Sequence, residues 1–217
     1  MAKIKQGILG GFSGKVAGVV GTSWKGRAVM KSRPLSVANP RTEAQQEQRG
    51  KFSSIAELAS KILTTFIQPV ENPISGDISG YNKFVKDNKG AFDAVGTLVE
   101  SAFGCGGGKI VNLQDVVVSA VEGHTSVDLS WTNAADLSAI RKTDKVYVAV
   151  FNEFGSLLAI SSGASTRNDE AVEVDTIDGD VLPESGNDIF VLYAAVSADG
   201  REVSVFTNAV KEQIANA

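Results

Sequence analysis

A strict alternation of apolar and polar residues occupies the stretch Ser126-Val127-Asp128-Leu129-Ser130-Trp131-Thr132. Successive side chains of a β-strand point to opposite faces, so Val127, Leu129 and Trp131 are expected on one buried face. The stretch therefore predicts a half-buried strand, and it introduces a period of two that continues through the C-terminal half of the chain.

Six further strands are expected around this one. They are residues 116–121, 145–151, 157–161, 171–175, 189–196 and 202–206. Residues 145–151 and 189–196 are nearly continuous apolar runs, which is typical of central strands, and Asp199-Gly200 signals a tight hairpin turn before the last strand. Short strands separated by turn clusters predict an immunoglobulin-like β-sandwich over residues 110–217.

The first part of the chain follows a different pattern. Residues 1–38 are Gly-rich and predict a β-hairpin arm, with strands at 15–20 and 27–33 joined by a turn at 21–26. Two strands alone are marginally stable in water. The arm is therefore expected to pack on its own helices, on another subunit or on a larger partner.

Residues 39–103 predict a helical segment. Thr42 and Gln45 have the spacing of a capping box, and apolar residues recur at intervals of three and four over 52–67 until Pro69 ends the pattern. The sequence thus predicts a first helix that starts just after Thr42.

A second helical pattern covers residues 79–102, with Gly90 and Gly96 as expected breaks or kinks. Residues 104–109 are Gly-rich and are expected to form a flexible linker to the sandwich. The predicted fold class is α+β and mainly β: a hairpin arm, one or two helices and a C-terminal sandwich.

The net charge of −4 conceals a strong asymmetry. Residues 1–51 carry ten basic and two acidic residues, a net charge of +8, and the remainder carries −12. This polarity favours contact with nucleic acid, or a head-to-tail contact between the basic part of one subunit and the acidic part of another; a solvated basic surface is the third interpretation.

The candidate interface consists of basic and aromatic residues from the N-terminal region, residues 1–51. They are Phe12, Lys15, Trp24, Lys25, Arg27, Lys31, Arg33, Arg41 and Arg49. Trp24 could stack on an unpaired base while the cations hold phosphates, or it could anchor a subunit interface. We favour the interface, because the arm also needs apolar cover.

Catalytic chemistry is not expected. Cys105 and His124 are the only residues of their types, so a metal site of Cys and His ligands cannot form within one chain. A phosphate loop at the Gly-rich segment fails because Phe103 and Ile110 stand where Gly and Ser or Thr are required. The acidic residues of 169–188 have the oxygen ligands that calcium accepts, but a solvated loop is favoured. We therefore expect neither an enzyme nor a cofactor nor a metal.

Two resemblances add to these expectations. Residues 126–132 and 193–200 resemble strands of fibronectin type III modules, in which a buried Trp anchors the core. At the front, residues 10–16, 21–26, 32–34 and 39–52 are similar to an uncharacterised family of gut-type bacterial genomes and their tailed phages, which pairs such a front end with a β-sandwich.

Asn39-Pro40-Arg41-Thr42 with its Gln-rich helix start is also similar to segments of phage head and tail proteins. The resemblance implies a non-enzymatic virion protein of the head, neck or tail, made in the host cytoplasm without export, whose partners are its own copies and other virion proteins. The alternative is a cytoplasmic nucleic-acid-binding protein that uses the basic front end. A carbohydrate-binding or adhesion module is a third interpretation, against which the lack of an export signal counts.

Overall fold

The computed structural model describes residues 3–4, 11–36, 39–133 and 137–216. The chain divides into two compact units, Met1–Thr42 and Glu43–Ala217. Among the described residues, no helix is both long and apolar enough to cross a membrane.

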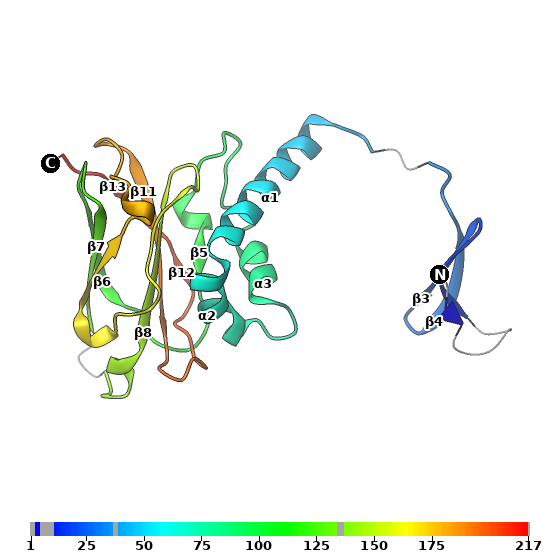
Figure 1. Cartoon of the computed structure of the whole chain (residues 1–217). Coiled ribbons are helices and arrows are strands. Elements are labelled where there is room, and N and C mark those ends of the chain that lie inside the picture. The colour runs from blue at the N-terminus through cyan, green and yellow to red at the C-terminus, as the bar shows by residue number, and fades with distance from the viewer. Residues whose placement is uncertain (1–2, 5–10, 37–38, 134–136, 217) are drawn as a thin grey trace. The chain divides into compact units, whose positions relative to one another are not determined.

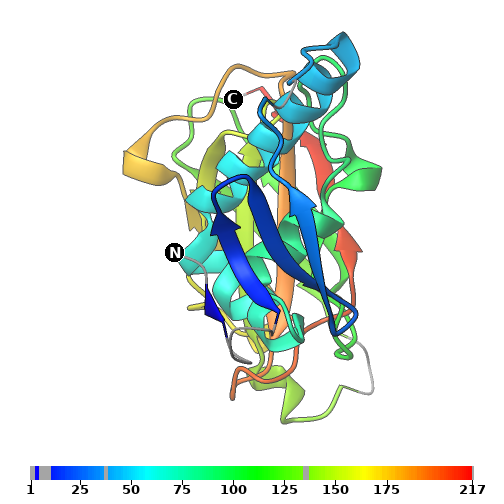
Figure 2. The ribbon, with the colours of Figure 1, turned by 90° about the vertical axis from the view of Figure 1, so that its right-hand side faces the viewer.

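The N-terminal unit is an antiparallel four-stranded sheet with the order β1-β2-β3-β4. The strands are β1 (Lys3–Ile4), β2 (Phe12–Val16), β3 (Val19–Trp24) and β4 (Arg27–Ser32), and Figure 2 shows them in blue. Lys25 and Gly26 join β3 to β4, and both have positive φ angles, 47° and 78°. These angles are those of a type I′ turn, whose twist suits a two-residue hairpin.

The predicted turn at residues 21–26 is wrong in its extent. Residues 21–24 belong to β3, and the turn shrinks to Lys25-Gly26. Gly21 suits this strand because the ring of Phe12 lies over it: a Cβ on Gly21 would stand 2.5 Å from ring atom Cδ2. The glycine therefore serves close packing between strands and not a turn.

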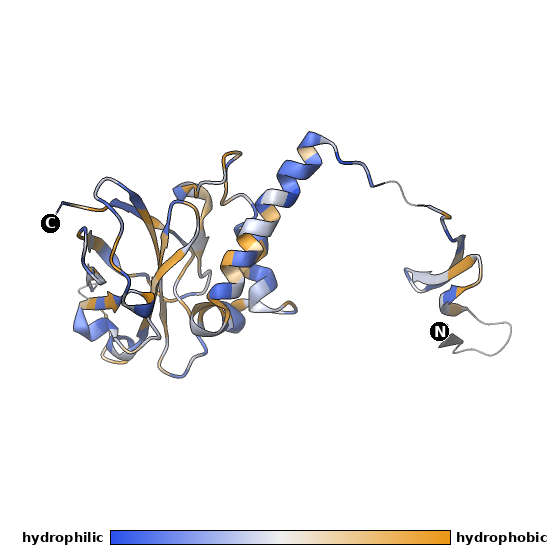
Figure 3. Cartoon of the chain, turned by 45° about the horizontal axis from the view of Figure 1, so that its top comes forward, coloured by the Kyte–Doolittle hydropathy of each residue, from blue (hydrophilic) through white to orange (hydrophobic). Residues whose placement is uncertain are grey.

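The C-terminal unit begins with a helical layer. Its elements are α1 (Glu43–Lys61), a π-helical turn η1 (Leu63–Ile67), α2 (Gln68–Glu71), a 3-10 turn η2 (Asn72–Ile74) and α3 (Gly80–Asp87). Figure 3 shows that α1 is hydrophilic where it starts and becomes hydrophobic toward its end, in agreement with the burial of Ile55, Leu58 and Ala59.

Pro69 does not end the helical path, contrary to the prediction. The N–H of Ile67 donates to the carbonyl of Ile62 at 3.0 Å, five residues back, so the chain widens into a π turn just before the proline. Pro69 then lies in the first turn of α2, where a missing N–H costs nothing.

The second predicted helix is shorter than expected. Ser79 caps α3 by accepting a hydrogen bond from the N–H of Asn82 at 3.2 Å, but the helix ends at Asp87 rather than near residue 102. Beyond it, the Asp93 carboxylate accepts hydrogen bonds from the N–H groups of residues 95–97. This Asp-centred turn brings Phe92 and Leu98 together as a β-bridge, so their apolar spacing reflects a loop.

The predicted β-sandwich is confirmed. One sheet has the order β10-β7-β6, from β6 (Gln114–Ala120), β7 (Ser126–Thr132) and β10 (Ala171–Asp175). The other has the order β13-β11-β8-β9, from β8 (Lys145–Asn152), β9 (Leu157–Ile160), β11 (Asp188–Val196) and β13 (Val210–Gln213). The strand expected at 202–206 is reduced to two isolated bridges, Val203 with Val196 and Ser204 with Ile110, and the chain then forms β12 (Thr207–Asn208) and β13.

Three layers result, because β8 and β11 are covered on both faces. Val148 and Val150 pack into the core between the two sheets, whereas Ala149 and Phe151 pack against the helices. Figure 1 shows α1, α2 and α3 on one side of β8, and β6 and β7 on the other. Trp131 lies in the core between the sheets, as the alternating pattern predicted.

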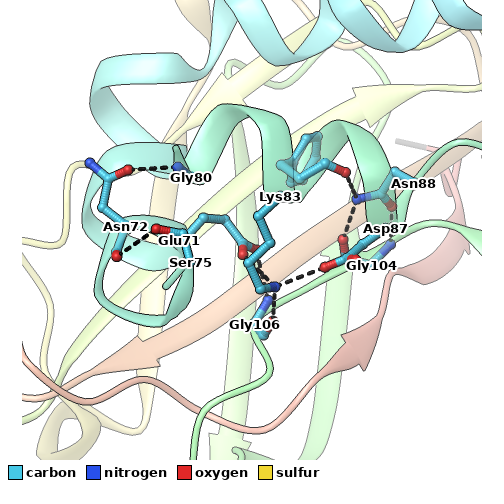
Figure 4. Close-up of polar contacts among 10 residues, drawn as sticks. Glu71, Asn72, Ser75, Gly80, Lys83, Asp87, Asn88, Gly104 and Gly106 are labelled. Carbon is cyan, nitrogen blue, oxygen red and sulfur yellow. Dashed lines mark hydrogen bonds and ion pairs between the residues drawn. The ribbon is translucent and has the colours of Figure 1, made fainter. Parts of the chain in front are cut away.

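Residues 104–109, expected to be a flexible linker, are part of the folded unit. Gly104 and Cys105 form strand β5, paired with β12. The Glu71 carboxylate accepts a hydrogen bond from the N–H of Gly106 at 2.9 Å, and Lys83 donates to Glu71 at 2.8 Å and to the carbonyl of Gly106 at 2.9 Å (Figure 4). The glycines allow the backbone to pass close to its neighbours, so the helical segment and the sandwich share one core.

Candidate assembly surface

The register of the N-terminal sheet assigns its side chains to two faces. Val16 pairs with Val19, Gly21 with Met30, and Lys15 with Val20, which in turn pairs with Lys31. Since directly paired residues share a face and neighbours along a strand alternate, these pairs define the whole surface.

One face is uncharged and largely apolar in its described residues. We call it the apolar face; its larger side chains are Phe12, Val16, Val19, Ala28 and Met30. Met30 is 70% exposed and Val16 is 51% exposed. Among residues 11–36, Gly21 alone is buried, so the described part of this sheet encloses no core of its own.

The opposite face is basic. We call it the basic face; it contains Lys15, Val20, Thr22, Trp24, Arg27, Val29 and Lys31. Trp24 is 61% exposed and pairs with Arg27, and the ammonium of Lys25 in the adjoining turn lies 5.1 Å from the centre of the Trp24 ring. No acidic residue precedes Glu43, so the N-terminal unit itself has no negative side chain to offset the charge of this face.

The nine residues predicted from sequence therefore do not form one surface. Phe12 lies on the apolar face, and Arg33 follows β4, where its N–H donates to the carbonyl of Gly18 at 2.7 Å. Arg41 lies after the end of the sheet, and Arg49 belongs to α1 in the C-terminal unit. The structure brings together Lys15, Trp24, Lys25, Arg27 and Lys31.

Sequence reasoning missed the apolar face. Its large exposed side chains, Val16, Val19 and Met30, were not predicted. The signal was present in Lys25-Gly26: a two-residue turn there fixes Trp24 opposite Arg27, and the faces of both strands follow from that register.

Cys105, the Gly-rich segment at 104–109 and His124 were also considered as functional groups, and each has local contacts within the fold. Burial raises the pKa of the Cys105 thiol well above its usual value, so the thiolate needed for nucleophilic attack is disfavoured. The N–H groups of Gly107 and Gly108 both donate to the carbonyl of Ser204, so they are not free to bind a phosphate. His124 lies at the end of a turn, and its N–H donates to the carbonyl of Val121 at 3.2 Å.

Two acidic residues of the segment 169–188 make separate local contacts. Asp169 accepts a hydrogen bond from the N–H of Thr166 at 2.7 Å, and Asp188 pairs with Lys211 at 2.6 Å. Within the described part of the chain, no group of three or more His, Cys, Asp or Glu residues is placed to hold a metal ion.

The sequence of the chain was compared with known protein families. Residues 11–209 match a family of unknown function, DUF6266. The chain belongs to the DUF6266 family. The DUF6266 match includes β2, β3 and β4 together with the helical layer and most of the sandwich, so the basic and apolar faces lie inside the region that defines the family. Among curated proteins, no match was found.

Proposed function

We propose that this protein is a non-enzymatic structural protein that assembles through its N-terminal sheet, and that the assembly is the particle of a tailed phage, at its head, neck or tail. The observation that carries the proposal is a sheet with two exposed faces, one apolar and one basic, and with Gly21 as the single buried residue among residues 11–36.

Such a sheet gains stability when a partner covers it. Small sheets depend on packing of an apolar face, and exposed apolar patches commonly mark interaction sites. Strand β4 is also an edge of the sheet, and all six of its residues are exposed. An exposed edge strand offers backbone N–H and C=O groups to an added strand, and apolar side chains such as Met30 then contribute binding energy.

Two further features support a non-catalytic role in a phage particle. The segment Asn39-Pro40-Arg41-Thr42 resembles segments of phage head and tail proteins, and it directly precedes α1. The one thiol of the chain is buried with a raised pKa, which supports a role without catalysis. The expected partners are other copies of the chain and other virion proteins.

Deletion of residues 1–42 tests the proposal. The remaining unit, Glu43–Ala217, contains both hydrophobic cores, so it is expected to fold. Full-length and shortened chains are expressed from the phage genome with a C-terminal tag, and their amounts in gradient-purified particles are compared by mass spectrometry. We expect the shortened chain to be at least tenfold depleted. Equal amounts of the two chains, or absence of the full-length chain from particles, would contradict the proposal.

A nucleic-acid-binding role is the second candidate, because Lys15, Arg27 and Lys31 share one face with the exposed ring of Trp24. Aromatic rings stack on unpaired bases while cations hold phosphates. This candidate predicts binding that weakens steeply between 50 and 200 mM salt, by about 10³-fold or more for six phosphate contacts. Lys31→Ala should reduce the salt slope by about one, and Lys86→Ala in α3 should not. The candidate fails if neither single-stranded DNA nor RNA is retarded at low salt.

A further inference from the structure

The outer face of the three-stranded sheet of the sandwich carries a second charged surface. Its paired residues form two rows across the strands, Val117–Ser130–Ala171 and Ser119–Asp128–Glu173, and Asp175 pairs with Ser126 beside them. We call these residues the acidic face. Asp128, Glu173 and Asp175 are all exposed, and no Lys or Arg belongs to these rows.

The placement of these carboxylates is unfavourable for an isolated sheet. Glu173 lies directly opposite Asp128 on the neighbouring strand, at a separation where like charges repel. In the described part of the chain, none of the three carboxylates forms an ion pair. A positively charged partner would remove this repulsion.

The rest of the acidic face consists of small side chains and one exposed apolar side chain. Ser119, Ser126, Ser130 and Ala171 have small side chains, and Val117 is 60% exposed. Apolar and small residues beside exposed charges are suited to an interface, in which a large aromatic side chain packs at the centre and ion pairs lie at the rim.

The basic face of the N-terminal sheet matches this surface in charge and in size. The row Lys15–Val20–Lys31 crosses strands β2, β3 and β4, and the row Ser119–Asp128–Glu173 crosses β6, β7 and β10, so each row extends about 10 Å with strands about 4.8 Å apart. Lys15 and Lys31 flank an uncharged residue at the centre of one row, and Trp24 is available to cover the small side chains of the other face.

We propose that the basic face of one copy docks on the acidic face of a second copy of this chain. This inference rests on the proposed assembly role and names the partner. The two faces are different surfaces of the same protein, so each copy both gives and receives a contact, and repetition of that contact produces rings or filaments. The apolar face of the sheet stays open to another component of the particle.

Charge reversal tests the contact in solution, with the full-length chain. One variant, Lys15→Glu/Lys31→Glu, makes both faces negative, and the other, Asp128→Lys/Glu173→Lys, makes both positive. Lys86→Glu/Lys89→Glu and Asp77→Lys/Glu100→Lys are matched controls, because these side chains are exposed and lie outside both faces. Self-association is measured by sedimentation velocity over a range of protein concentrations, and circular dichroism checks the fold of each chain.

We expect wild type and both controls to associate, and each reversed variant to weaken association at least about 100-fold, because like charges then face each other. Mixing the two reversed variants should restore association, since each then offers the charge that the other lacks. A contact within a single copy would not be restored by mixing.

The inference is overturned if wild type stays monomeric at all concentrations, if the reversed variants associate as wild type does, or if the mixture fails to associate. Particle incorporation of Asp128→Lys/Glu173→Lys separates this failure from failure of the assembly role. Wild-type incorporation of that variant overturns docking between copies and leaves the role of the N-terminal sheet intact.

Discussion

At the scale of single residues, Gly21 shows how one missing side chain organises the N-terminal sheet. The backbone carbonyl oxygen and the ring of Phe12 occupy the space that a Cβ on Gly21 would need. Sequence reasoning placed this glycine in a turn because glycine is common there, yet its φ lies outside the left-handed region in which turn glycines often fall. The distinguishing signal is the aromatic residue on the neighbouring strand, and it becomes visible only once the register is known.

Gly21→Ala is expected to displace Phe12 and open the sheet, while the C-terminal unit stays folded. Trypsin should then cleave at Arg27 and Lys31 at least tenfold faster, with no change in the melting temperature of the Glu43–Ala217 unit. Gly18→Ala is the matched control, because nothing lies within 4 Å of the position of its Cβ. Equal cleavage rates for the two variants would contradict the packing role of Gly21.

Glu71, Lys83 and the backbone of Gly106 form a polar cluster inside the C-terminal unit. Burial raises the pKa of Glu71, although Lys83 and the Gly106 N–H oppose that shift. For Lys83, burial lowers the pKa, but hydrogen bonds to Asp87 and Glu71 outweigh it, so the net shift is upward. The ammonium therefore stays charged among its three oxygen acceptors.

The losses of stability from removing Glu71 and from removing Lys83 should not be additive. Glu71→Gln is expected to lower the free energy of unfolding by about 2–3 kcal/mol, since Lys83 keeps Asp87. Lys83→Met should cost about 3–5 kcal/mol, because it leaves a buried carboxylate without its cation. The double variant should be more stable than the sum of the two losses predicts, as urea unfolding of all four proteins would show. Additive losses would mean that the two groups do not interact.

The raised pKa of Glu71 also predicts a pH dependence. A carboxyl with a higher pKa in the folded state binds more protons there than in the unfolded chain. Its contribution to stability is therefore complete below its ordinary value of 4.5 and is lost as the pH rises through the folded pKa. Glu71→Gln should flatten this part of the curve of unfolding free energy against pH. If the unfolding free energy changed with pH above 4.5 with the same slope in wild type and in Glu71→Gln, the raised pKa of Glu71 would be contradicted.

At the scale of elements, the sequence predicted strands better than helix ends. Alternation in 126–132 and 171–175 corresponds closely to β7 and β10, because one face of each is buried. The ends of helices depend on nonlocal features: the π turn before Pro69 and the Asp93 turn after α3 are local solutions that apolar spacing does not encode. The same holds for residues 104–109, whose glycines serve close backbone contacts with β12 and Glu71.

Substitutions of Trp131 test the role of strand β7, on which the prediction of a sandwich rests. Its ring is buried between the sheets, and Nε1 donates to the carbonyl of Arg167 at 3.2 Å. Trp131→Ala is expected to lower the unfolding free energy by about 3–5 kcal/mol through the cavity that it leaves. Trp131→Phe should cost only about 1 kcal/mol for the lost hydrogen bond, because Asn133 also donates to that carbonyl at 2.8 Å. Similar losses for the two variants in denaturant unfolding would show that the ring does not fill the core.

At the scale of the whole molecule, composition predicted the kind of surface but not its geometry. The charge asymmetry between residues 1–51 and the remainder indicated a basic region, and its contact with a partner stays a prediction. The division of that region into an apolar face and a basic face required the strand register, and the acidic face required the pairing of Glu173 with Asp128. Long-range register depends on turn geometry and on which faces are buried, so a single sequence does not specify it fully.

The N-terminal sheet is expected to be covered by a partner in the assembled state, and the proposed function depends on that cover more than on any other feature. Amide hydrogen exchange of residues 12–32 tests it directly, by comparing the dilute chain with the same chain in purified particles. We expect rapid exchange in the dilute chain and at least tenfold slower exchange in particles, while β8 and β11 exchange slowly in both. Equal exchange of residues 12–32 in the two states would contradict the claim.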